Sequence, residues 1–257
     1  MCTRVRRGWL GFEFDTGELW RRRVAGSPSA ILDALGARCE GTRLLYEAGP
    51  TGFGLARAGA ERDMEVLVCS PGSVPRAAGD RVKSDVRDAE RLLSSWRAGQ
   101  LSFVRLPTVA EEGFGDLIRA REDARGDLMR QRHRLSTFLL RRELRCSGAA
   151  TAWTGQWMRW LATLRFSKLP VRVTFSDHVA CVEQATQRRT MLDSAIEPAW
   201  PESPFAETIA RLRAFAAIST LTGAGLAAEI GDFERFSAPS RLAGFLGIVP
   251  SEAALID

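Results

Sequence analysis

The sequence is poor in several residues on which common protein classes depend. Lysine occurs only at Lys83 and Lys168, so arginine supplies 34 of the 36 basic side chains. There are two histidines, and the five cysteines are scattered without any C-x-x-C spacing. This pattern argues against a zinc site and favours reduced thiols in a cytoplasm. Because no apolar run reaches about 18 residues, which a membrane-spanning helix needs, we expect no membrane partner.

Length and charge narrow the class of protein further. The chain has 257 residues, 45% of them hydrophobic, and a net charge of +5, which suits one large or two modest domains. Between Arg119 and Arg145, nine arginines accompany four acidic residues. Such a stripe is typical of a protein that binds a polyanion. A solvated helix face with ion pairs explains it equally well, and the sequence leaves both interpretations open.

Strand-like and helix-like segments alternate within the first hundred residues. Two extended segments, 9–14 and 18–26, flank the turn signal Asp-Thr-Gly and predict a hairpin. Further strands are predicted over 43–49 and 64–71, and helices over 27–39 (with Ser27 as the N-cap), 51–62 and 83–99. Strands that alternate with helices indicate an α/β layer whose central strands are parallel.

The pattern becomes helical from about residue 109. Long helices are predicted over 109–144 and 177–196, and the long middle helices suggest a homo-oligomer. Between them, Trp153, Trp157 and Trp160 recur at near-helical spacing, which favours hydrophobic packing over base stacking. Prolines at 198, 201 and 204 predict a linker before a small helical unit over 206–252.

Three carboxylates form the candidate site. Glu47 ends a predicted strand just before a Gly-Pro turn, and working residues of open α/β sheets collect at the carboxyl ends of strands. Asp85 and Asp88 lie three residues apart on one helix face. Three convergent carboxylates suit hard divalent ions. The alternative is structural: Ser84 caps the helix, Asp85 lies near the positive end of its dipole, and Lys83, Arg87 and Arg91 pair with the aspartates.

Three segments together resemble a known family. They are YEAGPTGFGL (46–55), PRAAGDRVKSDVRDAERL (75–92) and AISTLTGAGLAAEIGDFERFSAPSRLAGFLGIVPSE (217–252). In this order they resemble the insertion-sequence 110 group of DEDD transposases, over nearly the whole chain. The resemblance implies an RNase H-like domain similar to the junction resolvase RuvC, a coiled-coil middle, and a C-terminal domain with a serine nucleophile. It further implies DNA and a structured non-coding RNA of the element as partners, in a bacterial cytoplasm.

Carried over to this sequence, the resemblance makes Glu47, Asp85 and Asp88 catalytic residues and ligands of Mg²⁺ (or Mn²⁺). Basic neighbours of the site are expected to contact phosphates, and they are Arg76, Arg81, Lys83 and Arg87. The implied domains are 1–107, RNase H-like with a mixed sheet and flanking helices; 108–200, a helical coiled coil; and 201–257, a small all-α transposase domain that is incomplete.

Two features of the family are expected to be missing. By the resemblance, metal is bound through four acidic residues, Asp, Glu, Asp and Asp, and the first Asp belongs on an opening strand. Residues 1–8 contain no acidic residue, so we expect that strand to be absent. The serine should follow the segment ending in Ser251-Glu252, and Ser251 itself is not assigned as the nucleophile. The chain therefore looks truncated at both ends, and we expect little or no recombinase activity from it alone.

Gly223 and Gly225 are the last candidate contacts. The pattern predicts a tight turn at these glycines between two helices, loosely similar to a helix-hairpin-helix element, with exposed N–H groups that attract phosphate. An ordinary helical hairpin packing its apolar residues is the alternative. For the whole chain, two rivals to a transposase stay open: a non-catalytic nucleic-acid-binding remnant and a RuvC-like metal-dependent nuclease.

Overall fold

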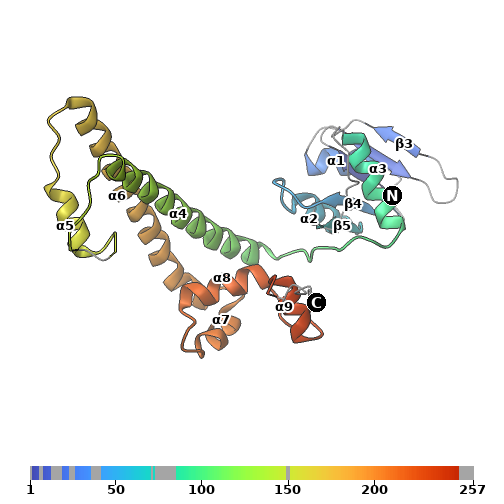
Figure 1. Ribbon diagram of the computed structural model, residues 1–257. Helices are drawn as coiled ribbons and strands as arrows, with labels where there is room; N and C mark the ends of the chain where they lie inside the picture. The colour runs from blue at the N-terminus through green and yellow to red at the C-terminus, as the bar shows by residue number, and fades with distance from the viewer. Residues whose placement is uncertain are drawn as a thin grey trace, which may run out of the picture. The chain divides into compact units, whose positions relative to one another are not determined.

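The computed structural model (Figure 1) describes residues 2–5, 8–12, 19–22, 27–35, 42–70, 72, 85–148 and 151–248, and in the first three ranges and at residues 85 and 86 it describes the backbone alone. The chain forms two compact units, Met1–Leu106 (unit 1) and Pro107–Asp257 (unit 2). Among the described helices, none combines the length and the apolar character needed to cross a membrane.

Unit 1 contains a mixed five-stranded sheet. Its strands are β1 (Cys2–Val5), β2 (Gly8–Phe12), β3 (Leu19–Arg22), β4 (Leu44–Glu47) and β5 (Val66–Cys69), in the order β3-β2-β1-β4-β5. β1, β2 and β3 are antiparallel neighbours, whereas β1 with β4 and β4 with β5 are parallel pairs. The predicted hairpin and the predicted parallel strands are confirmed, and the Asp-Thr-Gly turn lies outside the described residues.

The expectation that the opening strand is absent is wrong. β1 lies at the centre of the sheet and pairs with β2 on one side and β4 on the other. The sequence gives little sign of it, because Cys2–Val5 is short, contains Arg4 and lacks an apolar run. Neighbours that pair on both sides supply the stabilisation that the local sequence does not. The strand carries no acidic residue.

Helices cover both faces of the β4–β5 part of this sheet. Leu44, Tyr46 and Val68 point into a core shared with α1 (Pro28–Leu35) and α2 (Gly54–Ala60). Leu45 and Cys69, on the opposite face, pack against α3 (Asp85–Arg97). The alternation of side chains along a strand explains this division. The N-cap prediction for α1 is confirmed, since the Ser27 hydroxyl accepts a hydrogen bond from the Ala30 amide.

Unit 2 is built on two long paired helices, α4 (Val109–Leu140) and α6 (Leu169–Ala199), with α5 (Gly155–Thr163) between them in the chain (Figure 1). A capping box fixes the start of α4, in which Thr108 and Glu111 exchange hydrogen bonds through side chains and backbone amides. α6 begins eight residues before the predicted helix, because Pro170 in its first turn is compatible with a helix start.

Short helices close unit 2: the 3₁₀ turn η3 (Trp200–Glu202), α7 (Ala206–Arg213), α8 (Thr220–Ile230) and α9 (Pro239–Phe245). Phe114 and Ile118 of α4, Ile196 of α6, and residues of α7 and α8 share one core. The linker predicted from Pro198 onward is wrong at its start, because Pro198 lies inside α6 and Pro201 inside η3. Of the closing helices, α7 and α8 therefore pack directly on the long pair.

Candidate metal centre and nucleic-acid interface

Glu47 is the last residue of β4, as the sequence predicts. It pairs in register with Cys69, the last residue of β5, and the following amide, that of Ala48, donates to the Cys69 carbonyl at 2.9 Å. The chain then turns, with a hydrogen bond from the Gly52 amide to the Gly49 carbonyl, and the Tyr46 hydroxyl donates to the Gly52 carbonyl. This bonding fixes the backbone that carries the Glu47 side chain.

The direction of Glu47 follows from its neighbours on β4. Leu45 faces α3, Tyr46 faces α1 and α2, and alternation places Glu47 on the α3 face with Leu45. The thiol of Cys69 reports the same placement: its pKa is raised to about 11, first by burial and then by the negative charge of Glu47. The Glu47 carboxylate, itself exposed, thus lies near the edge of the buried α3 face.

Asp88 lies on α3 beside the packed surface of that helix. It is half-buried and adjoins Ala89, which is buried, and Leu92, one turn further along, packs on Leu45 and Cys69. Arg91 forms an ion pair with Asp88 at 3.5 Å, as the structural alternative predicts. Asp85 is the first residue of the helix, and its side chain lies outside the described part of the chain.

The three-carboxylate site therefore stays a prediction. Among the side chains that the structure describes, no three His, Cys, Asp or Glu residues form a group able to hold a metal ion. That set excludes Asp85. Of the predicted phosphate contacts, Arg87 is exposed on α3, while Arg76, Arg81 and Lys83, like the proposed cap Ser84, lie outside the described residues.

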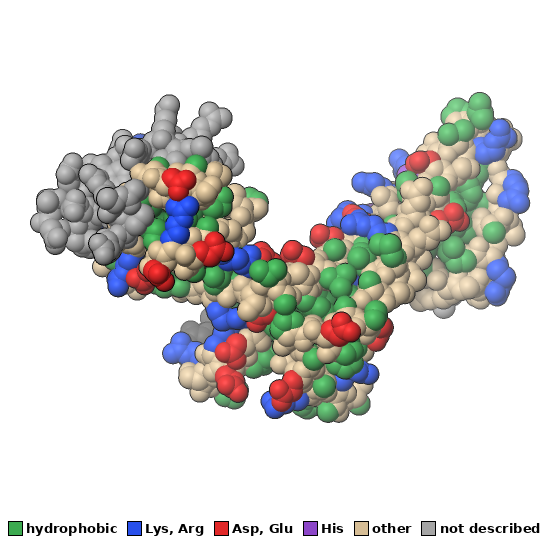
Figure 2. Space-filling view, turned by 180° about the vertical axis from the view of Figure 1, so that it is seen from behind, with side chains coloured by type: hydrophobic (Ala, Val, Ile, Leu, Met, Phe, Trp, Pro, Cys, Tyr) green, Lys and Arg blue, Asp and Glu red, His purple; other side chains and the backbone are tan. Residues whose placement is uncertain are grey.

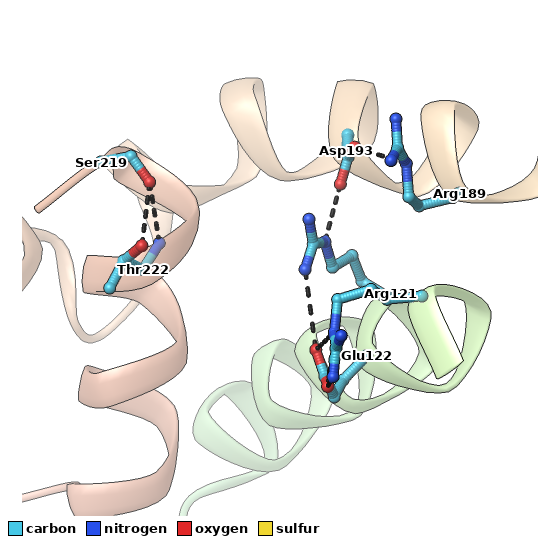
Figure 3. A network of polar contacts seen from close by, with 7 residues as sticks. Arg121, Glu122, Arg189, Asp193, Ser219 and Thr222 are labelled. Carbon is cyan, nitrogen blue, oxygen red and sulfur yellow. Dashed lines mark hydrogen bonds and ion pairs between the residues drawn. The ribbon is translucent and has the colours of Figure 1, made fainter. Parts of the chain in front are cut away.

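The turn predicted at Gly223 and Gly225 is wrong. Both glycines lie within α8, which Ser219 caps by accepting from the Thr222 amide (Figure 3). The Gly223 amide is already bonded to the Ser219 carbonyl at 2.8 Å. Gly223 is buried, and a Cβ there would lie 3.6 to 3.7 Å from Ile218 and Ile209, which is ordinary van der Waals contact, so the glycine belongs to the packed interior of unit 2.

The first part of the arginine stripe is paired with carboxylates. Arg121 of α4 donates to Asp193 of α6 at 2.7 Å, and Asp193 also pairs with Arg189 (Figure 3). Pairs three residues apart join Asp116 to Arg119, Glu122 to Arg125 and Asp127 to Arg130. The hydrogen bond from Arg125 is the main reason that the pKa of Glu122 lies below its usual range. In this part of the stripe the ion-pair interpretation holds.

The tryptophan stripe packs into a core, as predicted. Trp157 is buried, and the ring centroids of Trp153 and Trp157 lie 4.4 Å apart. Both belong to a cluster with Leu135, Phe138 and Val182 of the long helices. These rings close the end of the α4–α6 pair.

Comparison with known proteins shows which family the chain resembles. Residues 209–254 match the model of the Transposase IS116/IS110/IS902 family. The chain is 34% identical over 216 residues to the putative transposase y4qE of Sinorhizobium fredii, a match that covers 84% of this chain and 52% of the relative. It is 33% identical over 192 residues to the transposase for insertion sequence element IS1533 of Leptospira borgpetersenii, covering 74% and 55%.

These matches confirm the resemblance read from the sequence: the chain is similar to the IS110-type transposases of insertion sequences. The chain spans about half the length of the curated relatives it matches.

Proposed function

We propose that unit 1 is an RNase H-like domain that cleaves and rejoins DNA strands during transposition, with Glu47, Asp85 and Asp88 as ligands of Mg²⁺ or Mn²⁺. The observation that carries the proposal is the placement of Glu47 at the carboxyl end of β4, on the sheet face that α3 covers. A helix that follows a parallel strand and packs back on the sheet begins near this same end, which favours an approach of Asp85 and Asp88 to Glu47.

The sheet order adds support. Three antiparallel strands followed by two parallel ones, in the order β3-β2-β1-β4-β5, suit the RNase H-like architecture. Bound divalent ions would stabilise the attacking and leaving oxygens of an in-line displacement at phosphorus. The chain's own part is to supply the negative oxygens that hold the ions, while Arg76, Arg81, Lys83 and Arg87 position the phosphate backbone.

The absence of an acid on β1 leaves three carboxylates where the family has four. We infer that ions bind more weakly to three ligands, and that this chain alone cuts DNA slowly or not at all. The same absence favours a second candidate function, a nucleic-acid-binding remnant without chemistry. The resemblance also supplies an element-encoded RNA as a proposed partner, and the exposed Met129, Leu140 and Met191 on the long helices favour self-association.

Binding of Mn²⁺, measured by its electron paramagnetic resonance signal, tests the site without requiring activity. We expect binding that is lost in Glu47→Gln, Asp85→Asn and Asp88→Asn and kept in Glu90→Gln, a matched acidic residue exposed on the same helix. Any metal-dependent nicking of plasmid DNA should be lost in the same three variants and kept in Glu90→Gln. Equal Mn²⁺ binding by all four variants would refute the site, and salt-sensitive DNA binding without any Mn²⁺ site would favour the remnant.

A further inference from the structure

Positive charge is concentrated at one end of unit 2. Residues 129–176 contain ten basic residues and one acidic residue, Glu143, a local charge of +9. Since the whole chain carries +5, the remaining residues together carry −4. This segment comprises the end of α4, all of α5 and the start of α6. Lys and Arg side chains are visible along this end of the α4–α6 pair in Figure 2.

Eight of these residues form an exposed group that we call the basic cap. Its members are Arg134, Arg141, Arg142, Arg145, Arg159, Arg165, Lys168 and Arg172. The sequence pattern drew attention only to those before residue 146. The other four come from α5, from the segment that follows it and from the first turn of α6, which starts at Leu169. A charge count over 129–176, instead of one helix, would have found the whole set.

The cap differs from the rest of the α4–α6 pair in what its arginines contact. Nearer the start of α4, arginines pair with carboxylates of α4 and α6. Within the described residues, no cap side chain forms an ion pair with a carboxylate. Arg142 donates to the Phe138 carbonyl and lies 3.7 Å from its ring centroid, and Arg165 donates to two backbone carbonyls.

Eight exposed like charges repel one another, and a partner that brings many negative charges relieves the repulsion. The surface beneath is firmly packed, since Phe138, Trp157 and Leu161 are buried in one cluster under the cap. Arginine also suits forked contacts to phosphate oxygens. We propose that the basic cap binds the phosphodiester backbone of a nucleic-acid duplex, independently of the metal site in unit 1.

The aromatic residues nearby favour a duplex over a single strand. Proteins that hold single strands stack the bases on exposed aromatic rings. Here Trp157 is 7% exposed, and Arg132 lies 5.0 Å above the ring of Trp153. Contacts to a duplex backbone need no free ring and read no sequence.

Fluorescence anisotropy of the full chain tests the proposal with three labelled probes: a 30-base-pair DNA duplex, an RNA duplex of the same sequence, and single-stranded DNA. EDTA in every sample removes divalent ions, so the result does not depend on the proposed catalysis. The test variant combines Arg141→Gln, Arg145→Gln and Arg172→Gln. The control combines Arg125→Gln, Arg188→Gln and Arg211→Gln, three exposed arginines that pair with carboxylates. Both lose three charges, and circular dichroism checks their folding.

We expect the test variant to bind duplex DNA about 100-fold more weakly at 0.1 M salt, because each phosphate contact contributes about 0.9 to the logarithmic salt slope. The slope itself should fall by about 2 to 3, and the control variant should change much less. Binding of the RNA duplex distinguishes a general phosphate-backbone site from a DNA-selective one, and either result supports the proposal. Equal losses in the two variants, or tighter binding of single strands than of duplexes, would overturn the proposal.

Discussion

Glu47 and Cys69 lie side by side as register partners at the ends of two parallel strands. One side chain is exposed and acidic, and the other is fully buried. The pair thus marks where the interior of unit 1 meets the proposed catalytic edge of the sheet, and it offers a chemical probe of that boundary.

The Cys69 thiol should resist alkylation at pH 8, because burial and the Glu47 charge raise its pKa to about 11. A raised pKa disfavours the thiolate, so this thiol stabilises the folded chain below about pH 9 and the contribution is lost as pH rises toward 11. Glu47→Gln should lower the pKa only in part, since burial is the larger cause. Iodoacetamide labelling in EDTA, followed by peptide mass spectrometry, measures this. Labelling at pH 8 as fast as in urea would contradict it.

Gly59→Ala should destabilise unit 1 by about 1 to 3 kcal/mol, as overpacking does. A Cβ at Gly59 of α2 would meet Val66 Cγ2 of β5 at 2.3 Å, and Val66 is fixed in the sheet. Gly54→Ala on the same helix is the control, because its nearest contact is at 3.7 Å. Urea unfolding gives both free energies. A neutral Gly59→Ala would show that α2 can move away from β5.

The Arg121–Asp193 ion pair should couple α4 to α6 more strongly than an exposed pair. Their side chains are 21% and 25% exposed, whereas those of Arg211 and Glu207 are 77% and 79% exposed. Double-mutant cycles with Gln and Asn should give about 1 kcal/mol for the first pair and about 0.3 kcal/mol for the second. Equal coupling energies would mean that burial adds nothing at this contact.

Phe138→Ala should destabilise the distal core of unit 2 by about 3 to 5 kcal/mol. Phe138 is 1% exposed and its ring lies against Phe166, Phe175 and His178. Leu140→Ala, two residues along and 57% exposed, should change the unfolding free energy by less than about 0.5 kcal/mol. Guanidinium unfolding compares them, and similar losses would place the core elsewhere.

The strong local signals predicted most of the fold. The strand at Leu44–Glu47 and the helix capped by Ser27 combine apolar periodicity with clear boundaries. β1 escaped detection because its stability comes from pairing with β2 and β4. Gly223, which the sequence suggests as a turn residue, lies buried inside α8, and this placement depends on tertiary packing.

The site could be predicted only in part, for a similar reason. Glu47 is recognisable because the end of a strand is a local feature. The basic cap joins Arg141 of α4 with Arg159 and Arg172 of the later helices, and only the pairing of α4 with α6 brings them to one end. Basic residues on a single helix recur at helical spacing, whereas basic residues spread over three segments show no such pattern in the sequence.

The fixed start and unbroken course of α4 make it a molecular ruler. Thirty-two residues at about 1.5 Å each give a rod of about 48 Å. At 3.4 Å per base pair, this equals about fourteen base pairs of duplex. A nucleic acid that touched both extremities of this rod would need at least that footprint, and shortening the rod by whole turns should shrink the footprint in steps of one or two base pairs.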